Sequence, residues 1–252
     1  MIKNAPDYML IGCQKAGSTW LYENLVKHPQ VAIPMIFNEI DETELTRKEI
    51  SFFNDTHRYS AGIDFYTARF AVKKEGQIIG DHTITYHDMP ESKVKLISEL
   101  FPSLKILLLI RNPIDRAWSQ IKMQNGLKRK NIYDMQEIDM YKHFSYYAKF
   151  GLCYASLAVW RKYYKEEQIK ILFFEDIKEQ PENMLKSVFG FLGIKTEIDY
   201  SQFPVREYFV KGTDEPIPTH IRTFLVGIYE PEIRALVAEF GDKIKHWNVS
   251  DG

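Results

Sequence analysis

The sequence predicts an α/β fold of three layers, in which a central parallel β-sheet is flanked by helices. Two apolar runs, at residues 105–110 and 169–174, are nearly continuous, as is typical of parallel strands that are covered on both faces. A third run, at 8–12, leads into a segment of helical periodicity at 18–27. Because strands and helices alternate along the chain, we expect an open parallel sheet.

The remaining elements follow the same alternation. Residues 77–80 predict a weaker fourth strand. Apolar residues recur at helical spacing in 90–101, 113–126 and 147–164, where we expect helices, and again in the C-terminal stretch 221–247. Each pair of consecutive predicted strands is therefore separated by at least one predicted helix.

Length and composition predict one domain spanning residues 1–252. Of the 252 residues, 45% are hydrophobic and 14% are aromatic, so the chain can bury a sizeable core. The segment at about 127–146 has no clear period and is predicted to be an insertion into this domain.

Charge and cysteine content restrict the partners and the compartment that we expect. With 33 basic against 34 acidic side chains, no global field attracts nucleic acid or an anionic membrane, so any anion site is local. No apolar run approaches the ~20 residues that span a bilayer, and the N-terminus lacks the apolar core of a secretory signal. The two cysteines, Cys13 and Cys153, are too few for a disulfide framework and favour a reducing compartment. We therefore expect a cytoplasmic protein without a membrane span.

The loop after the first strand has the framing of a phosphate-binding P-loop. In residues 12–19, GCQKAGST, two glycines stand five positions apart between a strand and a helix. Ser18 replaces the lysine that follows the second glycine of a Walker motif, and the lysine stands inside the loop at Lys15. From there its ammonium can reach a bridging oxygen, while main-chain N–H groups and the helix dipole hold the phosphate. The expected fold is thus P-loop-like.

A second anion-binding element is predicted where the strand at 105–110 ends. A nucleotide kinase places a carboxylate there to position Mg²⁺, whereas this strand is followed by Arg111, which favours a second phosphate. Ser119 comes about two helical turns later, so both side chains can converge near the carboxyl end of the strand. No set of Cys, His and carboxylate residues has recognisable ligand spacing, so we expect no required metal.

These two motifs resemble those of the PAPS-dependent sulfotransferase family. Residues 15–20, KAGSTW, are similar to its 5′-phosphosulfate loop, and residues 111–119, RNPIDRAWS, to its 3′-phosphate element. The resemblance implies transfer of a sulfuryl group from 3′-phosphoadenosine-5′-phosphosulfate (PAPS) to a hydroxyl or amine of a small-molecule or glycan acceptor. Adenosine 3′,5′-bisphosphate (PAP) is then the product.

The resemblance also implies individual roles. Lys15 contacts the phosphosulfate bridge and stabilises the departing phosphate, Trp20 lies near the adenine, and Arg111 with Ser119 binds the 3′-phosphate. Later landmarks of the family add Tyr154, which stands one residue after a position where the family has tyrosine and this chain has Cys153. The implied donor-site residues are Lys15, Ala16, Gly17, Ser18, Thr19, Trp20, Arg111, Ser119, Tyr154, Lys211, Gly212 and Thr213.

Two residues are candidates for the general base. Residues 48–53, KEISFF, are similar to the heparan-sulfate branch of the family, in which the glutamate is the base, and this implies that role for Glu49 and a carbohydrate-like acceptor. In the branch that acts on small molecules, a histidine after the strand corresponding to 77–80 is the base, which is the place of His82. A histidine, with an ordinary pKa near ~6.5, accepts a proton at neutral pH, whereas a glutamate needs burial to raise its pKa from ~4.3. Both remain candidates.

Two other functions are compatible with a nucleotide site. One is an ATP- and Mg²⁺-dependent P-loop kinase, against which the missing Walker lysine argues, and the other is a nucleotide-binding protein without catalytic activity, against which the base candidates argue. The acidic pair at 175–176 imitates the end of a Walker B strand but is better explained as the start of a helix, where the dipole favours carboxylates.

Overall fold

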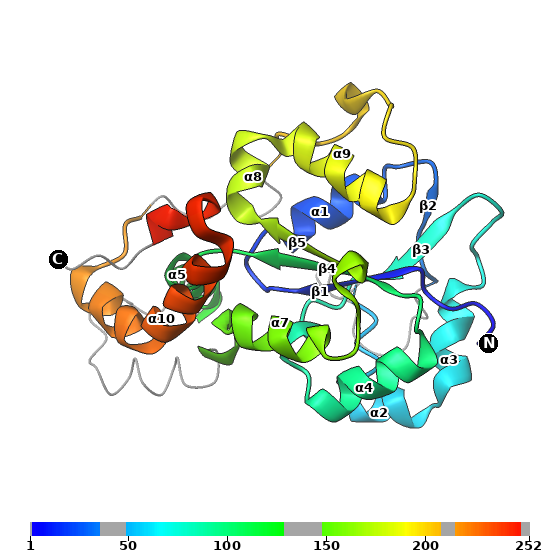
Figure 1. The fold of residues 1–252 in the computed structure, drawn as a ribbon, viewed down its shortest axis with the longest axis horizontal. Helices are drawn as coiled ribbons and strands as arrows, with labels where there is room; N and C mark the ends of the chain where they lie inside the picture. Colours follow the sequence, from blue (N-terminus) through cyan, green and yellow to red (C-terminus); the bar gives the residue numbers. More distant parts are fainter. Residues whose placement is uncertain (1, 36–48, 129–147, 208–214, 248–252) are drawn as a thin grey trace.

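The structure, a computed structural model, describes residues 2–35, 49–128, 148–207 and 215–247 (Figure 1). Within these ranges five parallel strands form one sheet in the order β2-β3-β1-β4-β5. The predicted α/β architecture with a central parallel sheet is thereby confirmed. The strands are β1 Tyr8–Gly12, β2 Val31–Ala32, β3 Ile78–Asp81, β4 Lys105–Ile110 and β5 Ile169–Phe173.

Helices cover both faces of the sheet (Figure 1). On one face lie α1 (Ser18–Leu25), α8 (Phe174–Glu179) and α9 (Pro181–Leu192), and on the other lie α4 (Glu91–Leu100) and α7 (Cys153–Arg161). The short helices α2 (Thr56–Ser60) and α3 (Ile63–Thr67) are on the same side as α4, whereas α5 (Pro113–Lys128) and α10 (Thr219–Phe240) pack against each other at one end of the molecule. Short 3₁₀ turns span Ala68–Phe70, Tyr86–Asp88, Ala148–Gly151, Glu166–Gln168, Tyr200–Gln202, Gly241–Lys243 and Lys245–Trp247.

The centre of the sheet is apolar because β1 and β4 are covered from both sides. All five residues of β1 are buried, as are the residues of β4 after Lys105. The two strands pair from Tyr8 opposite Lys105 to Leu10 opposite Leu107, and the register shifts before Gly12 pairs with Leu108. The regular pairing of β1 with β4 is therefore interrupted at the end of β1, where the predicted phosphate loop begins.

Most predicted elements occur within a few residues of their expected bounds, and the differences have local causes. The helix expected over 147–164 begins only at Cys153, because a separate 3₁₀ turn, Ala148–Gly151, precedes it. Gly151 packs closely in this turn, since a Cβ there would lie 2.6 Å from Tyr229 Cε1. Strand β2 has two residues and was not predicted. Glu175 lies in the first turn of α8, as the helix-start interpretation of 175–176 predicts. The insertion predicted at about 127–146 falls almost entirely outside the described residues.

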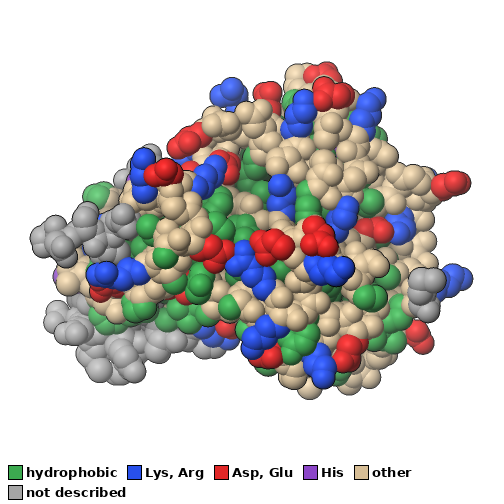
Figure 2. All heavy atoms as spheres, in the orientation of Figure 1, with side chains coloured by type: hydrophobic (Ala, Val, Ile, Leu, Met, Phe, Trp, Pro, Cys, Tyr) green, Lys and Arg blue, Asp and Glu red, His purple; other side chains and the backbone are tan. Residues whose placement is uncertain are grey.

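Basic and acidic side chains are interspersed over the face shown in Figure 2. This mixture agrees with the formal net charge of −1. On this face, an anion-binding site would therefore be built by local geometry rather than by a broad positive surface.

Candidate active site

The loop between β1 and α1 ends in a left-handed backbone conformation that favours glycine. Lys15 has φ 66° and Gly17 has φ 100°, both in the left-handed region. A Cβ on Gly17 would lie 2.4 Å from Ile177 Cδ1, so the Ile177 side chain would have to move to admit a larger residue. The main-chain N–H of Cys13 donates to the Leu109 carbonyl at 2.7 Å, which fixes the start of the loop to β4. The predicted phosphate loop of residues 12–19, which we call the cradle, is thus a tight loop that is fixed at both ends.

The first turn of α1 is suited to an anion. Its N-cap is Gly17, which has no side chain to satisfy the first main-chain N–H groups, and its first turn contains no acidic residue. The dipole of the helix adds positive potential at this end. Within the cradle, Lys15 and Thr19 are partly exposed, while Ala16 and Ser18 are buried.

The two predicted anion motifs meet in the structure. Arg111 Nη1 donates to the main-chain oxygen of Lys15 at 3.2 Å, so the residue that follows β4 touches the loop that follows β1. The Arg111 guanidinium lies over the Phe174 ring, 4.3 Å from its centroid. Burial lowers the pKa of Arg111, and the carboxylates of Asp115 and Glu175 oppose this effect, so the guanidinium keeps its charge.

Helix α5 contacts the cradle through Met123. Lys15 extends toward α5, where its Nζ lies 3.6 Å from Met123 Sδ. Ser119 and Met123 are four residues apart and therefore share one face of the helix. The start of α5 is fixed by Asn112, whose Oδ1 accepts the Ile114 N–H at 2.9 Å. Lys15 and Arg111 are thus in contact, and partly exposed Ser119 is expected on the face of α5 that Lys15 approaches.

Tryptophans from both motifs hold the flanks of a further segment. Trp20, at the start of α1, donates from Nε1 to the Val205 carbonyl, and Trp118, in α5, donates to the Glu215 carbonyl, each at 3.0 Å. The predicted donor residues 211–213 lie between these two anchor points but outside the described residues. The family resemblance implied an adenine contact for Trp20. The hydrogen bonds of the two indoles to main-chain carbonyls were not predicted from the sequence.

The segment that carries Glu49 is docked on the loop that follows β3. The Ser51 N–H donates to Thr83 Oγ1 at 2.9 Å, and Asn54 Nδ2 donates to Thr85 Oγ1 at 2.6 Å. Glu49 itself is partly exposed. The two base candidates, Glu49 and His82, are therefore carried by segments that contact each other.

His82 is enclosed on the face of the sheet that α1 covers. Only 2% of its surface is exposed, and its Nε2 lies 2.8 Å from the hydroxyl oxygen of Tyr8. The Tyr22 ring packs edge-on against it, with ring centroids 4.9 Å apart. Burial raises the pKa of Tyr8, so its hydroxyl stays protonated. Of the two candidates, Glu49 has the greater access to solvent.

The chain matches a known protein family over most of its length. The family described as "Sulfotransferase domain" matches residues 5–209. The chain belongs to the sulfotransferase family. This confirms the resemblance of the two anion motifs and makes sulfuryl transfer, rather than the phosphoryl transfer of the kinase alternative, the reaction of the family.

The relatives of this sulfotransferase include much longer proteins. It is 27% identical over 217 residues to the bifunctional heparan sulfate N-deacetylase/N-sulfotransferase 1 of Caenorhabditis briggsae, covering 80% of this chain and 23% of that protein. It is 24% identical over 314 residues to the membrane-associated sulfotransferase kil1 of Dictyostelium discoideum, covering 89% of this chain and 63% of that protein. The chain thus spans under two thirds of each of these relatives.

Solved structures show the same fold. A sulfotransferase from Alicyclobacillus acidocaldarius superposes with a TM-score of 0.72 at 20% identity, covering 96% of this chain and 98% of that chain. The mouse sulfotransferase SULT7A1, complexed with PAP, superposes with a TM-score of 0.55 at 13% identity, covering 94% of this chain and 89% of that chain.

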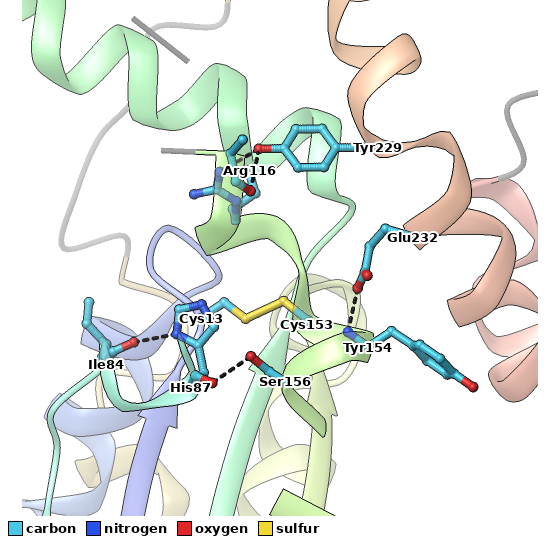
Figure 3. Close-up of a disulfide and its surroundings, with 10 residues drawn as sticks. Cys13, Ile84, His87, Arg116, Cys153, Tyr154, Ser156, Tyr229 and Glu232 are labelled. Atoms are coloured by element: carbon cyan, nitrogen blue, oxygen red, sulfur yellow. Dashed lines mark hydrogen bonds between the residues drawn. A yellow bond between two sulfur atoms is a disulfide. The ribbon is translucent and has the colours of Figure 1, made fainter. Parts of the chain in front are cut away.

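A disulfide joins the cradle of this sulfotransferase to α7 (Figure 3). Cys13 lies in the cradle, Cys153 is the first residue of α7, and the two are separated by 140 residues in the sequence. Both are fully buried. The low cysteine content of the sequence predicts a reducing compartment. Because the two cysteines are paired in the structure, they do not support that expectation.

The N-terminus of α7 is capped from α10. The Tyr154 N–H donates to Glu232 Oε1, while the Tyr154 ring points away from Cys13 (Figure 3). The structure therefore does not bring this predicted donor-site ring to the cradle. Glu232 is only 7% exposed, and burial raises the pKa of its carboxyl to about 7.

A buried arginine, Arg116, and a buried histidine, His87, lie in the surroundings of the disulfide (Figure 3). Arg116 Nη2 donates to the Tyr229 hydroxyl at 3.2 Å, which links α5 to α10 (Figure 3). His87 packs beneath the cradle, where a Cβ on Gly12 would lie 2.6 Å from its Nδ1. Burial lowers the pKa of His87, so its ring is neutral at neutral pH.

Within the described residues, no three His, Cys, Asp or Glu side chains are grouped so that they could hold a metal ion. In the same part of the chain, no helix combines the length and the apolar character needed to cross a bilayer.

Proposed function

We propose that this sulfotransferase transfers a sulfuryl group from PAPS to a hydroxyl or amine of a carbohydrate-like acceptor. The observation that carries the proposal is the bond between Arg111 Nη1 and the Lys15 carbonyl, which joins two anion-binding motifs at one place. A nucleotide with phosphate groups at both its 3′ and 5′ positions matches such a pair. The PAP complex of the mouse neighbour and the heparan sulfate N-sulfotransferase relatives support this choice of donor and acceptor.

The chemistry is an in-line displacement at sulfur. The acceptor oxygen or nitrogen forms a bond to sulfur while the bond from sulfur to the 5′-phosphate oxygen breaks, and PAP leaves with the electron pair. Lys15 neutralises the charge that develops on the departing phosphate, assisted by the N–H groups at the start of α1. Arg111 and Ser119 hold the 3′-phosphate, and Arg111 also fixes the loop that carries Lys15.

A base must take the proton of the acceptor, and we assign this role to Glu49. The access of Glu49 to solvent supports the assignment, because a base must reach the acceptor within hydrogen-bond distance. His82 is enclosed by Tyr8 and Tyr22, which suits a structural role better.

The donor assignment is tested by a thermal-shift titration with PAP and, in parallel, with ATP and Mg²⁺. A ligand that binds only the folded protein raises its melting temperature, so PAP is expected to stabilise the protein and ATP to have a smaller effect. Stabilisation by ATP alone would contradict the proposal.

The catalytic assignment is tested with labelled PAPS and a panel of acceptors that includes glucosamine oligosaccharides. The Lys15→Ala variant is expected to lose at least ~100-fold in kcat, while Lys27→Ala, an exposed lysine just after α1, keeps its activity. The pair Glu49→Gln and His82→Asn then distinguishes the two candidate bases. Turnover that persists in Lys15→Ala would argue against the mechanism.

A further inference from the structure

Asp81 is a fully buried carboxylate at the end of β3, on the face of the sheet opposite His82. Its Oδ1 accepts the Thr83 hydroxyl at 2.6 Å and the Thr83 N–H at 3.1 Å. Its Oδ2 accepts the Tyr66 hydroxyl, from α3, at 3.0 Å. A buried carboxylate is costly unless donors surround it, and here donors contact both oxygens.

The Thr83 hydroxyl relays this arrangement to the segment of Glu49. A hydroxyl has one proton and two lone pairs, and Thr83 donates its proton to Asp81. The oxygen is therefore oriented to accept the Ser51 N–H, which lies at 2.9 Å. Ser51 has φ 53°, a left-handed conformation that a serine adopts only when its surroundings hold it. Glu49 stands two residues earlier.

The aromatic residues that surround Asp81 hold the same segment from its other side. The Tyr66 ring stacks on Phe52, with centroids 4.8 Å apart, and the Tyr86 hydroxyl accepts the Phe53 N–H at 3.3 Å. Asp81 interacts with both tyrosines. Each residue from 51 to 53 therefore contacts a group that Asp81 orients.

We propose that Asp81 is a positioning residue for Glu49, acting through the Thr83 hydroxyl to fix the backbone that carries the base. The proposal rests on the proposed function, in which Glu49 accepts the proton of the acceptor. Donor binding is a separate matter, because none of these contacts involves the cradle.

The test is a double-mutant cycle between Thr83 and Glu49, read in kcat, in KM for PAPS and in the thermal shift produced by PAP. Thr83→Val removes the hydroxyl with little change of shape and is expected to lower kcat about 10- to 100-fold, with KM for PAPS and the PAP shift unchanged. Asp81→Asn is expected to do the same. Thr83→Ser keeps the hydroxyl and is expected to retain most activity. Thr67→Val, in a buried threonine of α3 that bonds within its own helix, is the matched control.

A positioning residue and a merely structural one differ in the double variant. If Thr83 acts through Glu49, then adding Thr83→Val to Glu49→Gln causes no further loss of kcat. An equal loss in both backgrounds would overturn the positioning role while leaving the base assignment intact. Full activity of Glu49→Gln would overturn the base assignment and with it the positioning role, and absence of the PAP shift would overturn the donor assignment alone. Variants that no longer melt cooperatively would show that the network serves the fold rather than Glu49.

Discussion

Glu232 makes the stability of this protein depend on pH in an unusual direction. Burial raises the pKa of its carboxyl from the ordinary 4.5 to about 7, so the folded chain holds this proton more tightly than the unfolded chain does. The contribution of this proton to the free energy of unfolding is therefore fully present below the unfolded pKa of 4.5. It is lost as the pH rises through the folded pKa of about 7. At roughly 1.4 kcal/mol for each pH unit between these values, the loss amounts to about 3 kcal/mol.

The substitution Glu232→Gln isolates this contribution. Glutamine keeps an acceptor oxygen for the Tyr154 N–H but carries no proton that titrates. Urea unfolding of both proteins from about pH 5 to about pH 8 gives the free energy of unfolding at each pH. Relative to the wild type, the variant is expected to gain about 3 kcal/mol over this range. The control is Glu230→Gln, a partly exposed glutamate of the same helix that pairs with Arg234.

Parallel pH profiles for wild type and Glu232→Gln would refute the reasoning. That result would mean that the carboxylate is charged in the fold at every pH tested. The N–H groups at the start of α7, which favour the anion, would then outweigh the loss of hydration.

Two further predictions concern the cradle. Gly17→Ala is expected to abolish the PAP-induced thermal shift and to lower the free energy of unfolding by on the order of 1–3 kcal/mol, because the alanine Cβ would lie 2.4 Å from Ile177 Cδ1 at a left-handed φ. Gly190→Ala, whose Cβ would come no closer than 3.7 Å to a neighbour, is the control in the same melt. Thiol titration of the unreduced, denatured protein is expected to find no reactive thiol, and two after reduction, as the Cys13–Cys153 bond requires. Two thiols before reduction would contradict the pairing.

The central features of the fold and of the site follow from local sequence patterns. Continuous apolar runs predict β1 and β4. A strand that is covered on both faces buries every side chain, so its apolar residues are consecutive and do not alternate with polar ones. The meeting of Lys15 with Arg111 follows from the rule that parallel strands bring their carboxyl ends to one edge of a sheet. Glycine spacing in the cradle is dictated by backbone conformation, which is a local property.

Features that depend on which distant segments become neighbours could not be predicted in the same way. Alternation along β3 separates Asp81 from His82, but only the pairing of β3 with β1 places the Tyr8 hydroxyl against His82. The disulfide joins residues 140 positions apart, a distance at which two cysteines carry no pairing signal. The bond from Thr83 to Ser51 likewise needs the docked position of a segment with no periodicity of its own.

The indoles of Trp20 and Trp118 bind main-chain carbonyls, those of Val205 and Glu215. A carbonyl is present at every position of a polypeptide, so neither anchor restricts which amino acid occupies residues 205 and 215. A substitution at residue 205 or 215 therefore leaves the acceptor of its indole in place, so both attachments can persist while the side chains at these two positions change.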